Sequence, residues 1–232
     1  MAELERALLE DRIDLAVHSA KDVPARLADG LELVAIPVRA DARDAICGAP
    51  SLAALPAGAR VGTSSLRRAA QIRAAREDLE VVEVRGNVDT RLRKLSAGEF
   101  DALVLALAGL QRLGREAEAG GVLDDLVPAA GQGALAVEAR AGRREQALDD
   151  PGSHACVAAE RQLTSALGAT CNTPVGANAR MIDGGMLELR AWVGRPDGSA
   201  WLADRLRGAP QELGGAVAQR LLSAGAEDLL RR

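Results

Sequence analysis

Charged and hydroxyl side chains follow an apolar run near the beginning of the sequence. The run 13–17 is predicted to be a buried strand, and Ser19, Lys21 and Asp22 come directly after it. Ligands of open α/β sheets bind at this carboxyl end of the strands. The lysine would bind a substrate carboxylate, and the aspartate would stabilise a developing positive charge. The same residues also fit an ordinary exposed turn closed by Pro24.

A second segment presents hydroxyl groups and arginines where a predicted strand gives way to a helix. It contains Thr63, Ser65, Arg67 and Arg68. Backbone N–H groups at a helix N-terminus can bind anions, and the helix dipole favours negative charge there. Two arginines in the first turn are unfavourable unless an anion lies beside them. A serine N-cap with arginines on a solvated face is the simpler alternative.

The arrangement recurs in the next unit, where Arg85 follows a strand and Arg91 lies in the first turn of a helix. Arginine pairs well with carboxylates, so two such places predict a small ligand with several carboxylates or phosphates. Nucleotides are disfavoured because the sequence lacks a P-loop motif and a complete GxGxxG motif. Cys171, by its loop alone, would be interpreted as a packing residue, as Cys47 and Cys156 are. The cysteine spacing suits neither a disulfide framework nor a metal site.

Strands alternating with helices are expected to position these groups. Helices are predicted at 3–12, 66–76, 88–97, 154–167 and 211–224. Strands are predicted at 13–17, 31–38, 80–84, 102–106 and 134–139, with others before Thr63 and near 176–181 and 186–193. The alternation predicts parallel βαβ units and an α/β class. The segment 120–133 is predicted to be a connection, and the chain from 153 onward a small α+β domain.

The composition excludes several classes of protein. The 232 residues carry 29 basic and 33 acidic side chains, with two tryptophans, one phenylalanine and no tyrosine. An acidic chain with so few aromatic residues is unsuited to binding nucleic acid. The longest apolar run, 102–110, is shorter than the ~18 residues of a membrane span, and the first residues are not signal-like. We therefore expect a cytoplasmic protein with no membrane or nucleic-acid partner. A monomer is expected as well.

Five motifs together resemble the porphobilinogen deaminase, or hydroxymethylbilane synthase, family. They occur in the family's order and cover nearly the whole chain: His18–Pro24, Val61–Arg68, Val84–Leu92, Ala129–Ala134, and Ala159–Arg161 followed by Cys171–Gly176. The resemblance implies a transferase of tetrapyrrole and heme biosynthesis. Such an enzyme joins four porphobilinogen units head to tail into hydroxymethylbilane and releases ammonia each time.

The resemblance also implies roles for individual residues. A dipyrromethane cofactor would be held by a thioether to Cys171. Asp22 matches the family's catalytic aspartate, with Lys21 as its partner, and its carboxylate would stabilise the cationic azafulvene left when ammonia departs. Positions that bind the acetate and propionate carboxylates of the cofactor and growing chain are matched by Ser19, Thr63, Ser65, Arg67, Arg68, Arg85 and Arg91. Gln132 matches the glutamine of the interdomain segment.

Three domains are expected. Residues 1–39 with 129–150 form the first, 40–128 the second and 153–232 the third. The first two are α/β lobes with parallel or mixed sheets, similar to those of periplasmic ligand-binding proteins. The active site is expected in the cleft between them, and the third domain would carry the cofactor into it.

Two departures from the family pattern accompany this expectation. Family members carry a further stretch before the position where this chain begins, so we expect the first domain to lack a strand. Ala169 and Thr170 stand where the family usually has a small pair before the cysteine. The alternatives are a polycarboxylate-binding two-lobe module without turnover and a transferase for phosphate-bearing substrates.

Overall fold

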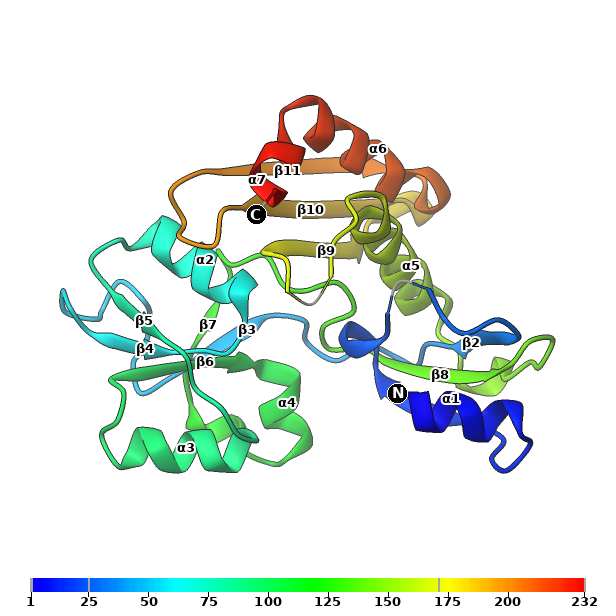
Figure 1. The fold of residues 1–232 in the computed structure, drawn as a ribbon, viewed down its shortest axis with the longest axis horizontal. Coiled ribbons are helices and arrows are strands. Elements are labelled where there is room, and N and C mark those ends of the chain that lie inside the picture. Colours follow the sequence, from blue (N-terminus) through cyan, green and yellow to red (C-terminus); the bar gives the residue numbers. More distant parts are fainter. Residues whose placement is uncertain (1, 25, 171, 232) are drawn as a thin grey trace.

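The computed structural model describes residues 2–24, 26–170 and 172–231, and Figure 1 shows its three lobes, each built around one sheet. The helices are α1 (Ala2–Leu9), α2 (Leu66–Ala75), α3 (Val88–Ser96), α4 (Leu107–Arg112), α5 (Pro151–Ala166), α6 (Pro210–Ser223) and α7 (Ala226–Leu230), with short 3-10 turns η1 (Ala20–Asp22), η2 (Glu116–Glu118), η3 (Gln146–Leu148) and η4 (Asp183–Gly185). The strands are β1 (Ala16–Ser19), β2 (Leu31–Ala35), β3 (Asp44–Cys47), β4 (Arg60–Gly62), β5 (Glu80–Val82), β6 (Ala102–Ala106), β7 (Ala119–Leu123), β8 (Leu135–Arg140), β9 (Val175–Met181), β10 (Leu187–Gly194) and β11 (Trp201–Gly208).

The first sheet joins the beginning of the chain to a strand that comes after the whole second lobe. Its order is β1-β8-β2, and both pairs are antiparallel, with Ala16 opposite Glu138. This pairing differs from the predicted parallel units because β8 returns from the second lobe in the direction opposite to its two neighbours. Among the described strands, β1 and β2 each pair with β8 alone, and Val17 on β1 is 61% exposed.

The second sheet is mixed and has the order β5-β4-β6-β3-β7. Strand β4 is parallel to β5 and β6, which confirms parallel pairing here, whereas β3 is antiparallel to β6 and β7. The sequence did not predict β3 or β7. Glycine weakens a strand, so Gly120 and Gly121 made β7 look like a connection. The structure explains these glycines, since a Cβ atom at either would collide with the carbonyl oxygen of Ala49 or Pro50.

The third sheet has the antiparallel order β11-β10-β9, and α5 and α6 pack against one of its faces (Figure 1). Its core includes Leu163 from α5, Leu189 from β10 and Val217 from α6, all fully buried. The predicted small α+β unit is confirmed. Strand β11 was not predicted, because Asp204 occupies a position that faces the helices. Arg220 on α6 neutralises this aspartate through a 2.7 Å hydrogen bond.

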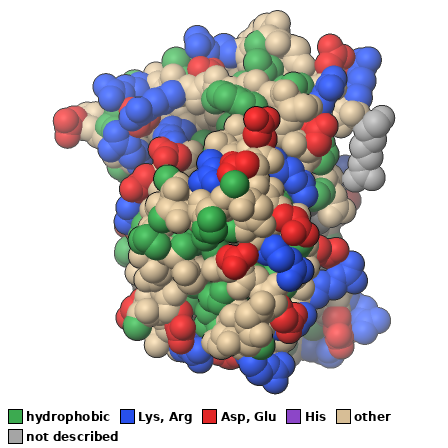
Figure 2. Space-filling view, turned by 90° about the vertical axis from the view of Figure 1, so that its left-hand side faces the viewer, with side chains coloured by type: hydrophobic (Ala, Val, Ile, Leu, Met, Phe, Trp, Pro, Cys, Tyr) green, Lys and Arg blue, Asp and Glu red, His purple; other side chains and the backbone are tan. Residues whose placement is uncertain are grey.

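The α/β class is thus confirmed, with the strands of each sheet drawn from one of the three predicted segments. The division into independent domains stays a prediction. None of the helices in the described chain has both the length and the apolar character needed to cross a bilayer. Figure 2 shows acidic and basic side chains interspersed over one face of the molecule, in keeping with the many surface ion pairs.

Candidate functional site

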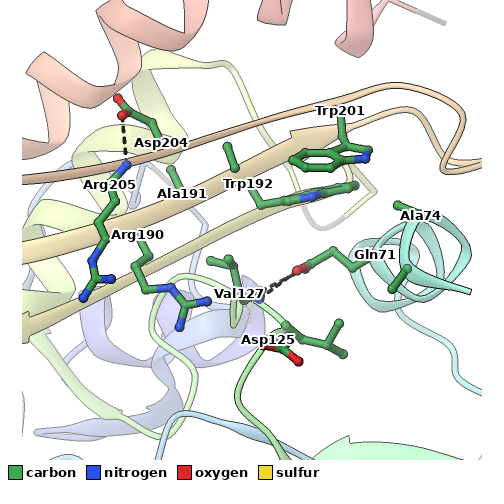
Figure 3. A pocket seen from close by; sticks show the side chains of 13 residues that line it. Gln71, Ala74, Asp125, Val127, Arg190, Ala191, Trp192, Trp201, Asp204 and Arg205 are labelled. Carbon is green, nitrogen blue, oxygen red and sulfur yellow. Dashed lines mark hydrogen bonds between the residues drawn. The ribbon is translucent and has the colours of Figure 1, made fainter. Parts of the chain in front are cut away.

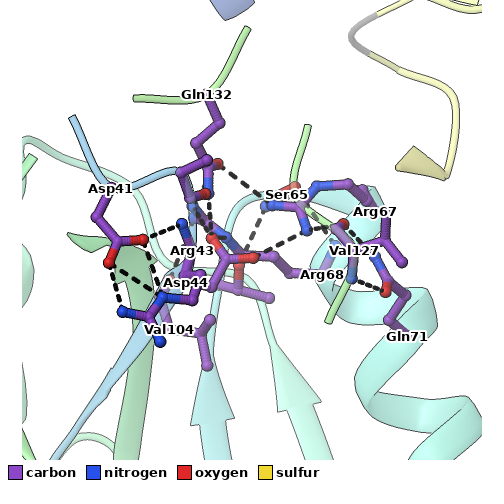
Figure 4. A network of polar contacts seen from close by, with 12 residues as sticks. Asp41, Arg43, Asp44, Ser65, Arg67, Arg68, Gln71, Val104, Val127 and Gln132 are labelled. Atoms are coloured by element: carbon purple, nitrogen blue, oxygen red, sulfur yellow. Dashed lines mark hydrogen bonds and ion pairs between the residues drawn. The ribbon is translucent and has the colours of Figure 1, made fainter. Parts of the chain in front are cut away.

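A fully buried carboxylate, Asp44 at the start of β3, lies between the two arginines of the α2 N-terminus (Figure 4). Its Oδ2 atom accepts a hydrogen bond from Arg67 Nη1 at 2.9 Å, and its Oδ1 atom lies 2.9 Å from Arg68 Nε and 2.8 Å from Arg68 Nη2. Burial alone would raise the pKa of Asp44, but Arg67 and Arg68 outweigh burial and hold it well below its usual value. The chain itself therefore supplies an anion for these arginines.

Gln132 joins this arrangement from the segment that leads to β8. Its Nε2 atom donates to Asp44 Oδ1 at 2.8 Å, and its Oε1 atom accepts from Nη2 of Arg67 at 3.4 Å and of Arg68 at 3.3 Å. Its side chain is almost fully buried. Three predicted site residues thus meet around one carboxylate that was not predicted, and we call Asp44, Arg67, Arg68 and Gln132 the Asp44 cluster.

One donor of the Asp44 cluster lacks an acceptor. Arg67 is 4% exposed, and its Nη1 atom also donates to the Val127 carbonyl at 2.8 Å. Its buried Nε–H, however, has no hydrogen-bond partner in the described structure. Leaving a buried donor unpaired costs about 1–3 kcal/mol. A ligand oxygen that reached this group would remove that cost.

The hydroxyl groups beside the cluster shape the start of α2. Ser65 is the N-cap, and its Oγ atom accepts from the Arg68 N–H at 3.4 Å. Thr63 is buried, and its Oγ1 atom accepts from the Ser65 N–H at 3.3 Å. These bonds fix the first turn and hence the backbone positions of the two arginines.

Cations from separate parts of the chain influence one another around Arg68. Lys21 in η1 is exposed as a residue, yet burial of its ammonium group, followed by repulsion from Arg68, lowers its pKa, while Asp22 opposes this shift. Burial, and then Arg68, also lower the pKa of Arg91 on α3. With Arg67, four cations gather here against the carboxylates of Asp22 and the Asp44 cluster. The excess positive charge suits an anionic ligand.

The other predicted residues lie nearer the surface. Ser19 ends β1 and is half-buried, Asp22 is exposed in η1, and Arg91 is half-buried. Arg85 is exposed, and its Nε atom donates to Glu83 at 2.8 Å. The structure therefore groups Arg67, Arg68 and Gln132 directly, and Lys21 and Arg91 through their charge, whereas Arg85 forms its ion pair outside the Asp44 cluster.

The predicted cofactor attachment point, Cys171, lies outside the described residues. The other two cysteines, Cys47 and Cys156, are buried in hydrophobic clusters, as predicted. Burial raises the pKa of each of these two thiols to about 11. Because the thiolate is the reactive form, both are poor nucleophiles at neutral pH.

A separate hollow of about 460 Å³ lies between α2 and the third sheet (Figure 3). Trp192 and Trp201 stack at its wall with ring centroids 6.5 Å apart. Gln71 and Val127 line it from the second lobe and bond to each other. In the described part of the chain, no predicted site residue lines this hollow, so it is distinct from the predicted site.

Two family models match the sequence, and together they span most of it. The model for "Porphobilinogen deaminase, dipyromethane cofactor binding domain" matches residues 1–148, and that for "Porphobilinogen deaminase, C-terminal domain" matches residues 154–223. This chain belongs to the porphobilinogen deaminase family.

Individual porphobilinogen deaminases match along nearly the whole chain. That of Roseiflexus castenholzii is 49% identical over 241 residues, covering 99% of this chain and 79% of the relative. That of Sorangium cellulosum is 54% identical over 220 residues, covering 91% of this chain and 71% of the relative. Among solved structures, a putative periplasmic sulfonate-binding protein from Methylobacillus flagellatus is 16% identical with a TM-score of 0.38, covering 70% of this chain and 52% of that one.

Another buried carboxylate, Glu160, joins the first and third lobes of this deaminase-family chain. Glu160 on α5 is fully buried and accepts from Arg39 Nη1 at 2.6 Å and Nη2 at 3.2 Å. It also accepts from the backbone N–H groups of Gly131 and Ala179, both at 2.7 Å. Arg39 lies between β2 and β3, Gly131 precedes β8, and Ala179 is in β9. One side chain of the third lobe therefore binds two separate segments of the first lobe, around Arg39 and Gly131.

Sequence reasoning missed the roles of the buried carboxylates Asp44 and Glu160. Asp44 begins a short apolar strand that was not predicted. Glu160 lies in the family motif Ala159–Arg161, but the motif does not indicate that its side chain is buried. The helix-dipole argument contained the signal for Asp44, because two arginines in a first turn require a nearby anion. For Glu160, the pattern of apolar and charged residues in α5 does not show whether the carboxylate is buried or exposed to solvent.

Proposed function

We propose that this chain is a hydroxymethylbilane synthase, which deaminates four porphobilinogen molecules and joins them head to tail. Membership of the porphobilinogen deaminase family over nearly the whole chain supports this activity. The observation that carries the site is the group of cations around Arg68, to which η1 contributes Lys21 and α3 contributes Arg91. Cations that repel one another in partly buried surroundings are stabilised by an anion between them. Porphobilinogen and its oligomers bring two carboxylates per pyrrole.

The donors at this place fit a dipyrromethane cofactor, whose side chains end in carboxylates. The unpartnered Nε–H of Arg67 and the guanidinium of Arg91 are suited to carboxylate oxygens. When bound, the cofactor supplies the anchored pyrrole to which substrate units are added. We propose that Cys171 holds it, and that the carboxylates of cofactor and growing chain are bound by Ser19, Thr63, Ser65, Arg67, Arg68, Arg85 and Arg91.

Asp22 is the proposed catalytic carboxylate, with Lys21 as its partner. Loss of ammonia from porphobilinogen leaves a positive charge on the substrate, and a fixed carboxylate stabilises that charge and can move protons. Asp22 is exposed in η1, so a substrate can reach it. Lys21 offers an ammonium group for a substrate carboxylate. Gln132 links the paired arginines to the segment between the lobes, because its Oε1 atom accepts from both.

The experiment measures porphobilinogen consumption and hydroxymethylbilane formation by the purified chain. Asp22→Ala is expected to abolish turnover, while mass spectrometry still shows the cofactor attached. Asp29→Ala is the matched control, because Asp29 belongs to the same lobe and its side chain is 92% exposed. Near-normal bilane production by Asp22→Ala would remove the role of Asp22. A chain that carries no extra mass and consumes no porphobilinogen would favour the binding-only module.

The same proposal includes the three-domain division, with the reaction in the cleft between the first two domains. A monomeric state and a cytoplasmic location remain predictions from the sequence. Size-exclusion chromatography with light scattering tests the monomer, and a dimer at micromolar concentration would contradict it.

A further inference from the structure

Adjacent arginines on a helix do not naturally point to one place. An α-helix has about 3.6 residues per turn, so successive side chains diverge by about 100°. Arg67 and Arg68 nevertheless converge, because Asp44 offers a separate carboxylate oxygen to each of them (Figure 4). The convergence therefore depends on a residue of another element, β3.

Further contacts hold the converged pair in one orientation. Arg67 Nη1 also donates to the Val127 carbonyl, and Arg68 Nη1 donates to the Val104 carbonyl at 3.3 Å. Gln132 accepts from both guanidinium groups. Because these acceptors come from three different segments, the guanidinium groups have little freedom to rotate. Asp44 is the only negative charge among these hydrogen-bond acceptors, so its loss would leave the buried pair without a counter-charge.

Asp44 itself is not suited to proton transfer. Its Oδ1 atom already receives hydrogen bonds from Arg68 and Gln132, and its Oδ2 atom receives one from Arg67. The residue is fully buried beneath these groups. Its contribution must therefore act through the arginines and not on the substrate directly.

We propose that Asp44 is the positioning residue of the carboxylate site. It holds Arg67 and Arg68 side by side and leaves the pair with one net positive charge, which suits one ligand carboxylate. The buried Nε–H of Arg67, which lacks a protein acceptor, is a donor available for that carboxylate. The identity of the ligand as a pyrrole carboxylate rests on the proposed function.

The test compares Asp44→Ala with Asp41→Ala. Asp41 precedes β3 and binds Arg43 Nε at 3.0 Å, so the control removes an arginine-bound carboxylate from the same segment outside the Asp44 cluster. The probe is uroporphyrin I, an octacarboxylate tetrapyrrole that is not consumed, and its dissociation constant is measured by absorbance titration. Asp44→Ala is expected to weaken binding about tenfold or more, as expected for a lost charge-assisted interaction. Asp41→Ala is expected to bind like the unmutated chain.

Chemical rescue and kinetics separate positioning from a general loss of structure. Formate is small enough to replace the missing carboxylate and is expected to restore binding by Asp44→Ala, whereas neutral formamide is not. In turnover, KM for porphobilinogen is expected to rise about tenfold while kcat changes less than about threefold, because binding is weakened in molecules that remain folded. A structural role alone would lower kcat with KM unchanged.

Several outcomes would overturn the proposal. These are an unchanged uroporphyrin affinity in folded Asp44→Ala, equal rescue by formamide, or no uroporphyrin binding by the unmutated chain. If Asp44→Ala does not fold, the isosteric Asp44→Asn replaces it, and unchanged affinity there is equally decisive. A chain that binds uroporphyrin in the expected pattern but does not consume porphobilinogen would refute the proposed function and leave the positioning role standing.

Discussion

Glu160→Ala is expected to destabilise the protein strongly. Removing one partner of a buried ion pair costs about 3–5 kcal/mol, because Arg39 would be left without its carboxylate. The N–H groups of Gly131 and Ala179 also lose their acceptor, at about 1–3 kcal/mol each if they stay unpaired. Water can enter the space left by the side chain and replace part of these bonds. We therefore expect a net loss of about 5–6 kcal/mol, near the lower end of the combined costs.

Urea unfolding followed by two signals measures this loss. Trp192 and Trp201 lie in β10 and β11, so tryptophan fluorescence reports the third sheet, whereas far-UV circular dichroism reports the whole chain. Glu160 joins the third lobe to two segments of the first, so its removal is expected to separate the two unfolding curves as well as shift them to lower urea. The control is Glu227→Ala, since Glu227 and its partner Arg231 are each more than two-thirds exposed. Such a surface pair contributes about 0–1 kcal/mol.

A loss for Glu160→Ala no larger than that for Glu227→Ala would refute the reasoning. It would mean that Arg39 and the two backbone groups find equivalent partners without the carboxylate. Coincident curves for the two signals, together with a large loss, would refute only the claim that Glu160 couples the lobes.

Two further predictions concern thiols and acid stability. If Cys171 carries the thioether, a thiol reagent at neutral pH should detect no rapidly reacting thiol in the folded protein. After denaturation it should detect two thiols, those of the buried Cys47 and Cys156, and a count of three would contradict the attachment. Hydrogen bonds from Arg205 above all, and then from Arg207 and Arg180, lower the pKa of Glu188 from 4.5 to about 2. The ionised Glu188 therefore stabilises the folded state fully above pH 4.5, and this contribution is lost as the pH falls toward 2. Glu188→Gln should therefore be less stable than the unmutated chain at pH 7, and the difference should shrink between pH 4.5 and 2; a difference that stays constant over this range would contradict the assignment.

The sequence was informative where a local pattern decides the structure. The hydroxyl run before α2 predicted the helix start, and Ser65 is indeed the N-cap. The two arginines of the first turn indicated a nearby anion, and Asp44 of the chain itself is one. The alternation of strand and helix predicted the parallel part of the second sheet. These features depend on residues that are close together in the chain, which is why one sequence is enough to find them.

Features that depend on distant partners were not predictable in the same way. Asp44 accepts a hydrogen bond from Gln132, which follows the last strand of the second lobe in the sequence. No residue near Asp44 in the sequence indicates that contact. Strand β7 was missed because glycine has a low strand propensity. Its two glycines are needed because the backbone of residues 49 and 50 leaves no room for a Cβ atom. Strand β11 was missed because the inward Asp204 depends on Arg220 of a later helix.

The position of β8 between β1 and β2 has a consequence for the order of folding. The second sheet uses only strands from Asp44 to Leu123, so all of its partners are available before β8 is synthesised. The first sheet cannot form until Leu135–Arg140 has left the ribosome, because β1 and β2 do not pair with each other. Contacts between residues far apart in sequence form slowly, and domains generally fold as units during synthesis. We therefore expect the second lobe of the nascent chain to be folded while residues 1–39 are still without the central strand of their sheet, β8.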